Sequence, residues 1–192
     1  MIIKKRKKFI YVFLLSVLTL AGLYYFFIYN SYKGEVRVDS TYIESTSTED
    51  LINRAELIVI GTPVNNFEER KHVVSYYNTM TIQDFYTITD MEVEQVLKGQ
   101  WNNKNISVIE PVSILQGFDG RRKLVSDDYV EMKKGNRYIV TLKKNSFGDY
   151  SVINMNNGVF NLNSTSFHNK LTFEENKNEE MKNELSRYYN IK

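Results

Sequence analysis

The longest apolar run in the chain is residues 9–29, FIYVFLLSVLTLAGLYYFFIY, which contains no charged residue. At about 1.5 Å of rise per residue, a helix of this length extends roughly 31 Å, the thickness of the hydrocarbon core of a bilayer. Tyr24, Tyr25 and Tyr29 cluster at its C-terminal end, where an aromatic belt would meet lipid headgroups. The pattern predicts a transmembrane helix over residues 9–29.

The charges that flank this run are unequal. Five basic residues at positions 4–8 precede it directly, whereas the four charged residues that follow it cancel. The positive-inside rule then places the basic tail, residues 1–8, in the cytoplasm and the C-terminal domain outside the cell membrane. A cleaved signal peptide is the alternative, but its apolar region is normally about 7–15 residues long. Residues 30–34 (NSYKG) are also a poor cleavage site.

Beyond the apolar run, the pattern changes to short apolar segments separated by turn residues. Residues 30–48 predict a tether, and residues 49–192 predict one extracytoplasmic β-rich domain. This domain begins with a short helix at about residues 49–55, capped by Ser47 or Thr48. It ends with a helix over residues 174–189, where apolar residues recur at helical spacing. Strands are expected at residues 57–62, 73–77, 85–97, 105–110, 137–143, 150–154 and 159–162.

The segment at residues 85–97 is unusually long for one strand. Phe85, Thr87, Thr89 and Met91 share one face, and the other face is acidic towards its end. A strand of this length is expected to bend or to carry a bulge. The later segment at residues 112–123 contains three turn-forming residues and is predicted to be a loop. The predicted fold class is mainly β: a small antiparallel β-barrel (OB-like) with a short N-terminal and a C-terminal helix, behind the transmembrane helix.

Four strand patterns occur in a familiar order. They are residues 55–62 (AELIVIGT), 87–99 (TITDMEVEQVLKG), 106–109 (ISVI) and 134–140 (KGNRYIV). This order resembles the OB-like barrel of tissue inhibitors of metalloproteinases and netrin-type modules, and also small exported bacterial proteins with a similar domain. The resemblance covers roughly residues 47–162. Those inhibitors act through an N-terminal cysteine, and this chain has no cysteine, so the resemblance implies the fold and not the inhibitory activity.

The charge distribution and the reactive residues limit the classes of function that the domain can have. Removing the five N-terminal basic charges from the net charge of +2 leaves −3 for the rest of the chain, which argues against a nucleic-acid partner. The two histidines, His72 and His168, lack neighbours at metal-ligand spacing, and there is no nucleophile elbow or phosphate-binding loop. We therefore expect no metal, no cofactor and no enzymatic activity. A hydrolase that uses His72 or His168 stays as an alternative.

The aromatic residues are the suggestive feature of the domain. Exposed aromatic side chains on a barrel can stack on sugars or anchor a partner protein, although cross-strand packing is the ordinary explanation. The candidates for partner contact are Trp101, Tyr76, Tyr77 and Tyr86, together with the loop at residues 112–123. The sequence thus predicts a membrane-anchored binding domain for a protein, peptide or cell-wall polymer.

An accessory or structural subunit of a membrane complex is the alternative function. Small residues allow close packing of helices within a bilayer. The apolar run offers Ser16, Thr19, Ala21 and Gly22 for such an interface.

Overall fold

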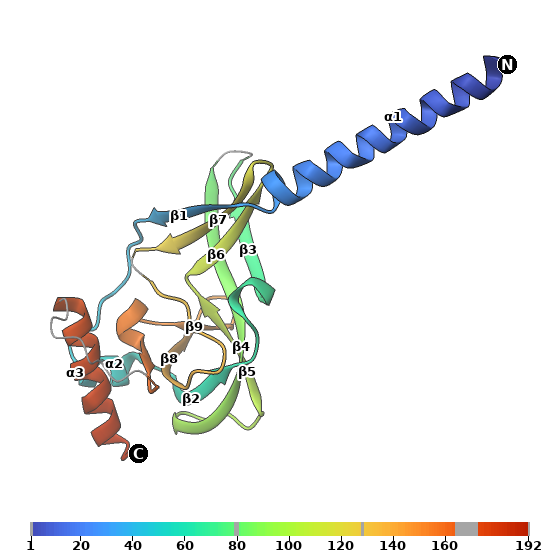
Figure 1. Cartoon of the computed structure of the whole chain (residues 1–192). Helices are drawn as coiled ribbons and strands as arrows, with labels where there is room; N and C mark the ends of the chain where they lie inside the picture. Colours follow the sequence, from blue (N-terminus) through green and yellow to red (C-terminus); the bar gives the residue numbers. More distant parts are fainter. Residues whose placement is uncertain (1, 79–80, 128, 164–172, 192) are drawn as a thin grey trace.

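A computed structural model describes residues 2–78, 81–127, 129–163 and 173–191. Its first element is a long helix, α1 (Ile2–Tyr24), which is apolar after Lys8 and continues as one π-helical turn, η1 (Tyr25–Tyr29). The stretch Lys8–Tyr29 is long and apolar enough to cross a membrane, and none of it is buried against the rest of the molecule. Figure 1 shows this helix projecting away from the domain that follows.

Five strands of that domain close into a β-barrel. They are β2 (Leu57–Pro63), β4 (Ile82–Lys98), β5 (Asn105–Glu110), β8 (Tyr138–Lys144) and β9 (Tyr150–Val152). β2 pairs antiparallel with β4 and with β8, and β4 also pairs antiparallel with β5. β5 and β9 pair in parallel, and an antiparallel β8–β9 pairing completes the ring. The order of strands around the ring is therefore β2, β4, β5, β9, β8 and back to β2. The predicted mainly β, OB-like barrel class is confirmed.

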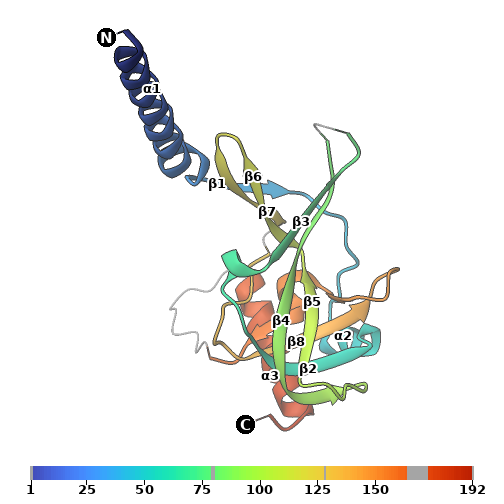
Figure 2. The same cartoon turned by 90° about the vertical axis from the view of Figure 1, so that its right-hand side faces the viewer.

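Two further strands extend this sheet. The short β10 (Val159–Asn161) pairs with β8, and β3 (Lys71–Tyr76) follows the turn η2 (Phe67–Glu69) and pairs with the first half of β4. We call the β3–β4 hairpin the arm, because both views show the end of β3 and the start of β4 extending beyond the barrel (Figures 1 and 2). Register shifts between β2 and β4 give β4 two bulges, which confirms the predicted irregularity of this long strand.

Alternating side chains divide the core into two parts. One part fills the barrel interior, with Leu57, Val59, Met91, Val108, Val140 and Leu142 among its buried residues. The other part lies outside the ring, where the helices α2 (Thr48–Arg54) and α3 (Phe173–Tyr188) cover β2, β8 and β10. The Ser47 side chain accepts a hydrogen bond from the Asp50 amide, so the predicted cap begins α2. Both predicted helices of the domain are confirmed.

The prediction of a loop over residues 112–123 is wrong. The chain forms a hairpin of β6 (Val112–Gly117) and β7 (Gly120–Ser126), and β1 (Tyr32–Val38) adds in parallel to β7 as a third strand. The segment expected as a tether, residues 30–48, therefore includes a paired strand. Its partner is far away in the sequence, so no local pattern marks it. The irregular burial along β6 and β7 also hides the usual alternation.

Candidate functional site

The predicted contact residues occupy two places in the molecule. Tyr76 ends β3 at the tip of the arm and Tyr77 follows it, with the Tyr77 side chain 73% exposed. Tyr86 lies half-buried on β4, directly opposite Val73 of β3. Trp101 follows the far end of β4, so roughly 50 Å of extended strand separates it from the arm tip. The structure places all three tyrosines on the arm, with Tyr76 and Tyr77 at the end of β3 and Tyr86 further along β4, and leaves Trp101 apart.

Trp101 has a packing role. Its indole ring meets the Tyr150 ring edge-on at 5.8 Å between centroids, and it packs against the core inside the barrel. The indole Nε1 donates a hydrogen bond of 3.2 Å to the Asn105 carbonyl. Packing against the barrel core therefore accounts for these contacts.

A buried charged cluster closes the barrel beneath the arm. Arg70, directly after η2, and Glu110, the last residue of β5, form an ion pair of 2.8 Å, with side chains only 1% and 0% exposed. The Arg70 guanidinium also donates to the carbonyls of Met132 and Asn65. The second Glu110 oxygen accepts from the Tyr129 hydroxyl at 2.9 Å and from the Met132 amide at 2.8 Å. One carboxylate thus joins η2, β5 and the segment before β8.

The electrostatics of this cluster reflect its burial. Loss of solvation raises the pKa of the Glu110 carboxyl, while the hydrogen bonds from Thr89 and the Met132 amide and the positive charge of Arg70 act in the opposite direction. Burial first, and then the neighbouring Glu110 carboxylate, raise the pKa of the Tyr129 phenol well above its ordinary value. The Glu110 oxygens accept hydrogen bonds from Arg70, Thr89, Tyr129 and the Met132 amide, so the cluster ties these segments together.

Sequence reasoning missed this cluster, although one signal was present. Ile106, Val108 and Glu110 alternate on β5 and are all buried, so the carboxyl occupies the third inward position of an apolar strand. An acidic residue at such a position requires a buried partner. No pattern around Arg70 identifies it as that partner, because the two residues meet only through the closure of the barrel.

His72 connects the arm to the β6–β7 hairpin. Its Nε2 lies 2.9 Å from the Phe67 carbonyl, which can only accept, so Nε2 carries the proton in the neutral ring. The Nδ1 atom then accepts from the Ile114 amide at 3.2 Å and lies 2.8 Å from the Thr87 hydroxyl. Burial lowers the pKa of His72, and the nearby Arg70 charge acts in the same direction. The second predicted histidine, His168, lies outside the described residues.

The apolar helix and the domain are joined by several hydrogen bonds. The Tyr24 hydroxyl donates to the Phe118 carbonyl at 2.6 Å, at the turn between β6 and β7. The Gln116 amide donates to the Tyr29 carbonyl at 2.9 Å, and the Arg121 side chain donates to the Asn30 carbonyl at 3.1 Å. We call this set of contacts the junction. Through it and the β1–β7 pairing, the end of the helix is fixed to the three-stranded sheet.

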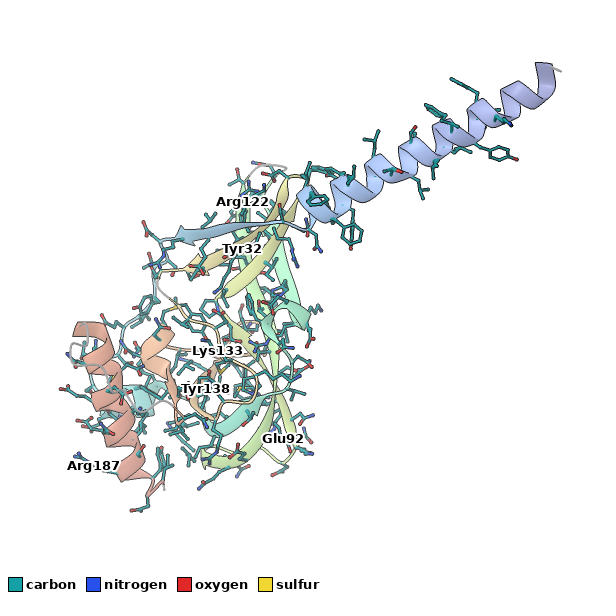
Figure 3. All side chains as sticks on the ribbon, in the orientation of Figure 1. Tyr32, Glu92, Arg122, Lys133, Tyr138 and Arg187 are labelled. Carbon is teal, nitrogen blue, oxygen red and sulfur yellow. The ribbon has the colours of Figure 1, made fainter. Side chains whose placement is uncertain are left out.

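The position of the junction divides the domain into two ends. Figure 3 shows Tyr32 and Arg122 at the end where the helix leaves, whereas Glu92 and Arg187 lie towards the opposite end. The tips of the arm and of the β6–β7 hairpin lie at the helix end in both views (Figures 1 and 2). The α3 helix and the C-terminus lie away from it.

No group of three His, Asp or Glu side chains that could hold a metal ion occurs within the described part of the chain. Comparison with known proteins finds no family model that matches the sequence and no curated protein that matches it. The class that the fold defines is a small OB-like barrel domain carried on an N-terminal apolar helix.

Proposed function

We propose that this protein is a single-pass membrane protein whose barrel domain is an extracytoplasmic interaction module without catalytic activity. The apolar helix is its anchor, the N-terminal basic tail lies in the cytoplasm, and the arm is the surface that contacts a partner. The partner is a protein, a peptide or a cell-wall polymer.

The junction is the observation that carries this proposal. A signal peptide is removed during export, so its helix has no reason to form specific hydrogen bonds with the mature domain. Here Tyr24, inside the apolar run, and Tyr29, at its end, both bond to the β6–β7 hairpin, and the following strand β1 is part of a sheet. Cleavage near residue 30 would remove these contacts, which supports a retained helix and a domain held at a fixed orientation.

The arm offers the best surface for a partner. It presents the exposed Tyr76 and Tyr77 at its tip and the half-buried Tyr86 along its length. Its base is braced, since Ser113 of β6 donates to the Val73 carbonyl at 3.3 Å and the Ile114 amide donates to His72. Tyrosine presents a large contact area with only two side-chain torsions, so it loses little conformational entropy when a partner covers it.

The outer face of the barrel favours a partner that is not a polyanion. Asp90, Glu92 and Glu94 alternate along β4 and point away from the barrel interior. They pair with Ser107, Lys104 and Arg137 respectively, so the row is polar and acidic. Nucleic-acid binding depends on clustered positive charge at the same place, which this face does not supply.

The assembly alternative, in which the helix pairs with a membrane subunit, has weaker support. The Ser16 and Thr19 hydroxyls donate to the Phe13 and Leu15 carbonyls of their own helix. These two hydroxyls therefore need no polar partner from another helix. Exchange of residues 9–23 for an unrelated apolar helix separates the two functions, because loss of function would favour the assembly alternative.

Protease treatment of intact cells tests the location. We expect added protease to degrade the domain while a fragment that contains the apolar helix stays with the membrane fraction. A domain that resists protease in intact cells but not in lysed cells would contradict the orientation. A domain recovered in the medium without its first thirty residues would show that the helix is a signal peptide.

Photo-crosslinking tests the contact surface. A photoreactive amino acid at Tyr77 should capture a partner in the native membrane, whereas the same group at Phe147 should not. Phe147 is the matched control because it is also an exposed aromatic residue outside the strands, 88% exposed, but it belongs to the β8–β9 connection. Equal capture at both positions, or capture at Phe147 alone, would reject the arm as the contact surface.

A further inference from the structure

We infer that the tip of the β6–β7 hairpin enters the outer leaflet of the bilayer, with Phe118 at the boundary between lipid headgroups and acyl chains. This inference rests on the proposed anchoring of the apolar helix. It adds a second lipid contact to the domain, formed by a hairpin instead of by the helix.

The depth of the tip follows from one hydrogen bond. The Phe118 carbonyl accepts from the Tyr24 hydroxyl at 2.6 Å, and Tyr24 lies five residues before the apolar stretch ends at Tyr29. At about 1.5 Å of rise per residue, Tyr24 is roughly 7 Å inside the end of that stretch. A helix that spans the bilayer up to Tyr29 therefore carries the hairpin tip into the interfacial region.

The hairpin cannot easily turn away from this position. Gly120 has φ +135°, and a Cβ atom added there would lie only 2.6 Å from the Ser31 carbonyl oxygen, so the turn packs directly on the chain that leaves the helix. The Arg121 amide also donates to the same Ser31 carbonyl at 2.8 Å. These backbone contacts hold the tip beside the helix end, as the views of Figures 1 and 2 show.

The chemistry of the tip fits a lipid surface. The Phe118 side chain is 90% exposed, and aromatic rings are the side chains that favour the interface of a bilayer. Around it lie basic groups: exposed Lys33, partly exposed Arg121, and Arg122, which is paired with Asp119. Positive charge beside an interfacial aromatic residue suits lipid phosphate groups.

A lipid surface explains the position better than a second protein does. A soluble partner that covered Phe118 would have to enter the layer that the Tyr24 contact assigns to headgroups. A membrane-embedded partner could do so, and that outcome is distinguished by the experiment below.

Site-directed labelling of the full chain in phospholipid vesicles tests the inference. The chain has no cysteine, so Phe118→Cys, Leu15→Cys and Phe147→Cys can each carry one environment-sensitive fluorophore. We expect the label at position 118 to emit at shorter wavelength than the label at 147. Quenchers attached to lipid near the headgroup should reduce its emission, and aqueous iodide should quench it several-fold less than the label at 147. Unchanged Trp101 emission confirms that each variant is folded.

The three positions separate the failure of this inference from that of the proposed function. A lipid-quenched label at 15 with a water-exposed label at 118 would overturn the hairpin insertion and leave the anchor intact. A label at 15 that lipid quenchers do not reach would overturn the anchor itself. A label at 118 that is shielded from iodide but not quenched by lipid would indicate a protein partner and also overturn the inference.

Discussion

The buried Arg70–Glu110 pair predicts two substitutions whose costs depend differently on pH. Glu110→Gln keeps the shape of the side chain but leaves the Arg70 charge without a counter-charge at a site that is 1% exposed. It also places amide hydrogens where Glu110 now accepts from the Met132 amide or from Thr89 and Arg70. Removal of one partner of a buried ion pair costs about 3–5 kcal/mol. Arginine stays protonated at all ordinary pH values and the glutamine amide does not titrate. The variant should therefore lose the pH dependence of stability that the raised pKa of Glu110 gives the parent.

Arg70→Met leaves the opposite charge behind. The Glu110 carboxyl can take up a proton, and burial already raises its pKa above the ordinary value of 4.5. Loss of the Arg70 charge removes an influence that lowers this pKa, so the folded variant should bind the proton more tightly than the unfolded chain does. A raised folded-state pKa means that stability falls as pH rises. Between the raised pKa of folded Glu110 and pH 4.5, each unit of acidification should therefore increase the free energy of unfolding of the variant by up to about 1.4 kcal/mol.

Urea unfolding of the full chain in mild detergent measures both effects. Trp101 is the one tryptophan and packs against the barrel core, so its emission reports unfolding of the domain. Glu92→Gln is the matched control, because Glu92 pairs with Lys104 at 3.0 Å on the exposed face of the same barrel. Its effect should stay within about 0.5 kcal/mol. A loss below about 1 kcal/mol for Glu110→Gln, or the same pH profile for both core variants, would refute the reasoning.

Three further predictions follow from other contacts. First, since burial lowers the pKa of His72 below 6.5, the unfolded chain binds the proton more readily than the folded chain. Stability should then fall as pH drops through about 6.5, and His72→Gln should flatten this slope relative to the parent; identical slopes in urea titrations from pH 5 to 8 would contradict the assignment. Second, Gly120→Ala should cost about 1–3 kcal/mol through backbone strain and contact with Ser31. Gly135→Ala should cost less, because Gly135 has φ +79° but open space around it. The urea unfolding midpoint of Gly120→Ala should therefore be the lower of the two. Third, Ser47→Ala should cost about 1 kcal/mol by removing the hydrogen bond that caps α2, and Thr46→Ala is the control. Equal unfolding midpoints for the two variants would contradict the capping role of Ser47.

The sequence by itself determined the elements that depend on neighbouring residues. The apolar run was visible because its uncharged residues follow one another without interruption, over the length of helix that a bilayer core requires. The two helices of the domain followed from the cap at Ser47 and from the helical spacing of Met181 and Leu185. The inward face of β4 followed from simple alternation. With these elements came the barrel class, since short strands with few helices bury their apolar faces best by closing on one another.

Only the tertiary structure decided which distant segments meet. The β1–β7 pairing joins residues about ninety positions apart, and neither strand carries a signal for the other. In the same way, Arg70 and Glu110 become partners only when barrel closure brings η2 against the end of β5, and Trp101 is a packing residue only because β9 supplies Tyr150. A local sequence pattern shows only the periodicity of a single helix or strand, and not which other segment it packs against. The choice of partner depends on the free energy of the whole chain, and so the junction and the buried cluster could not be predicted from the sequence.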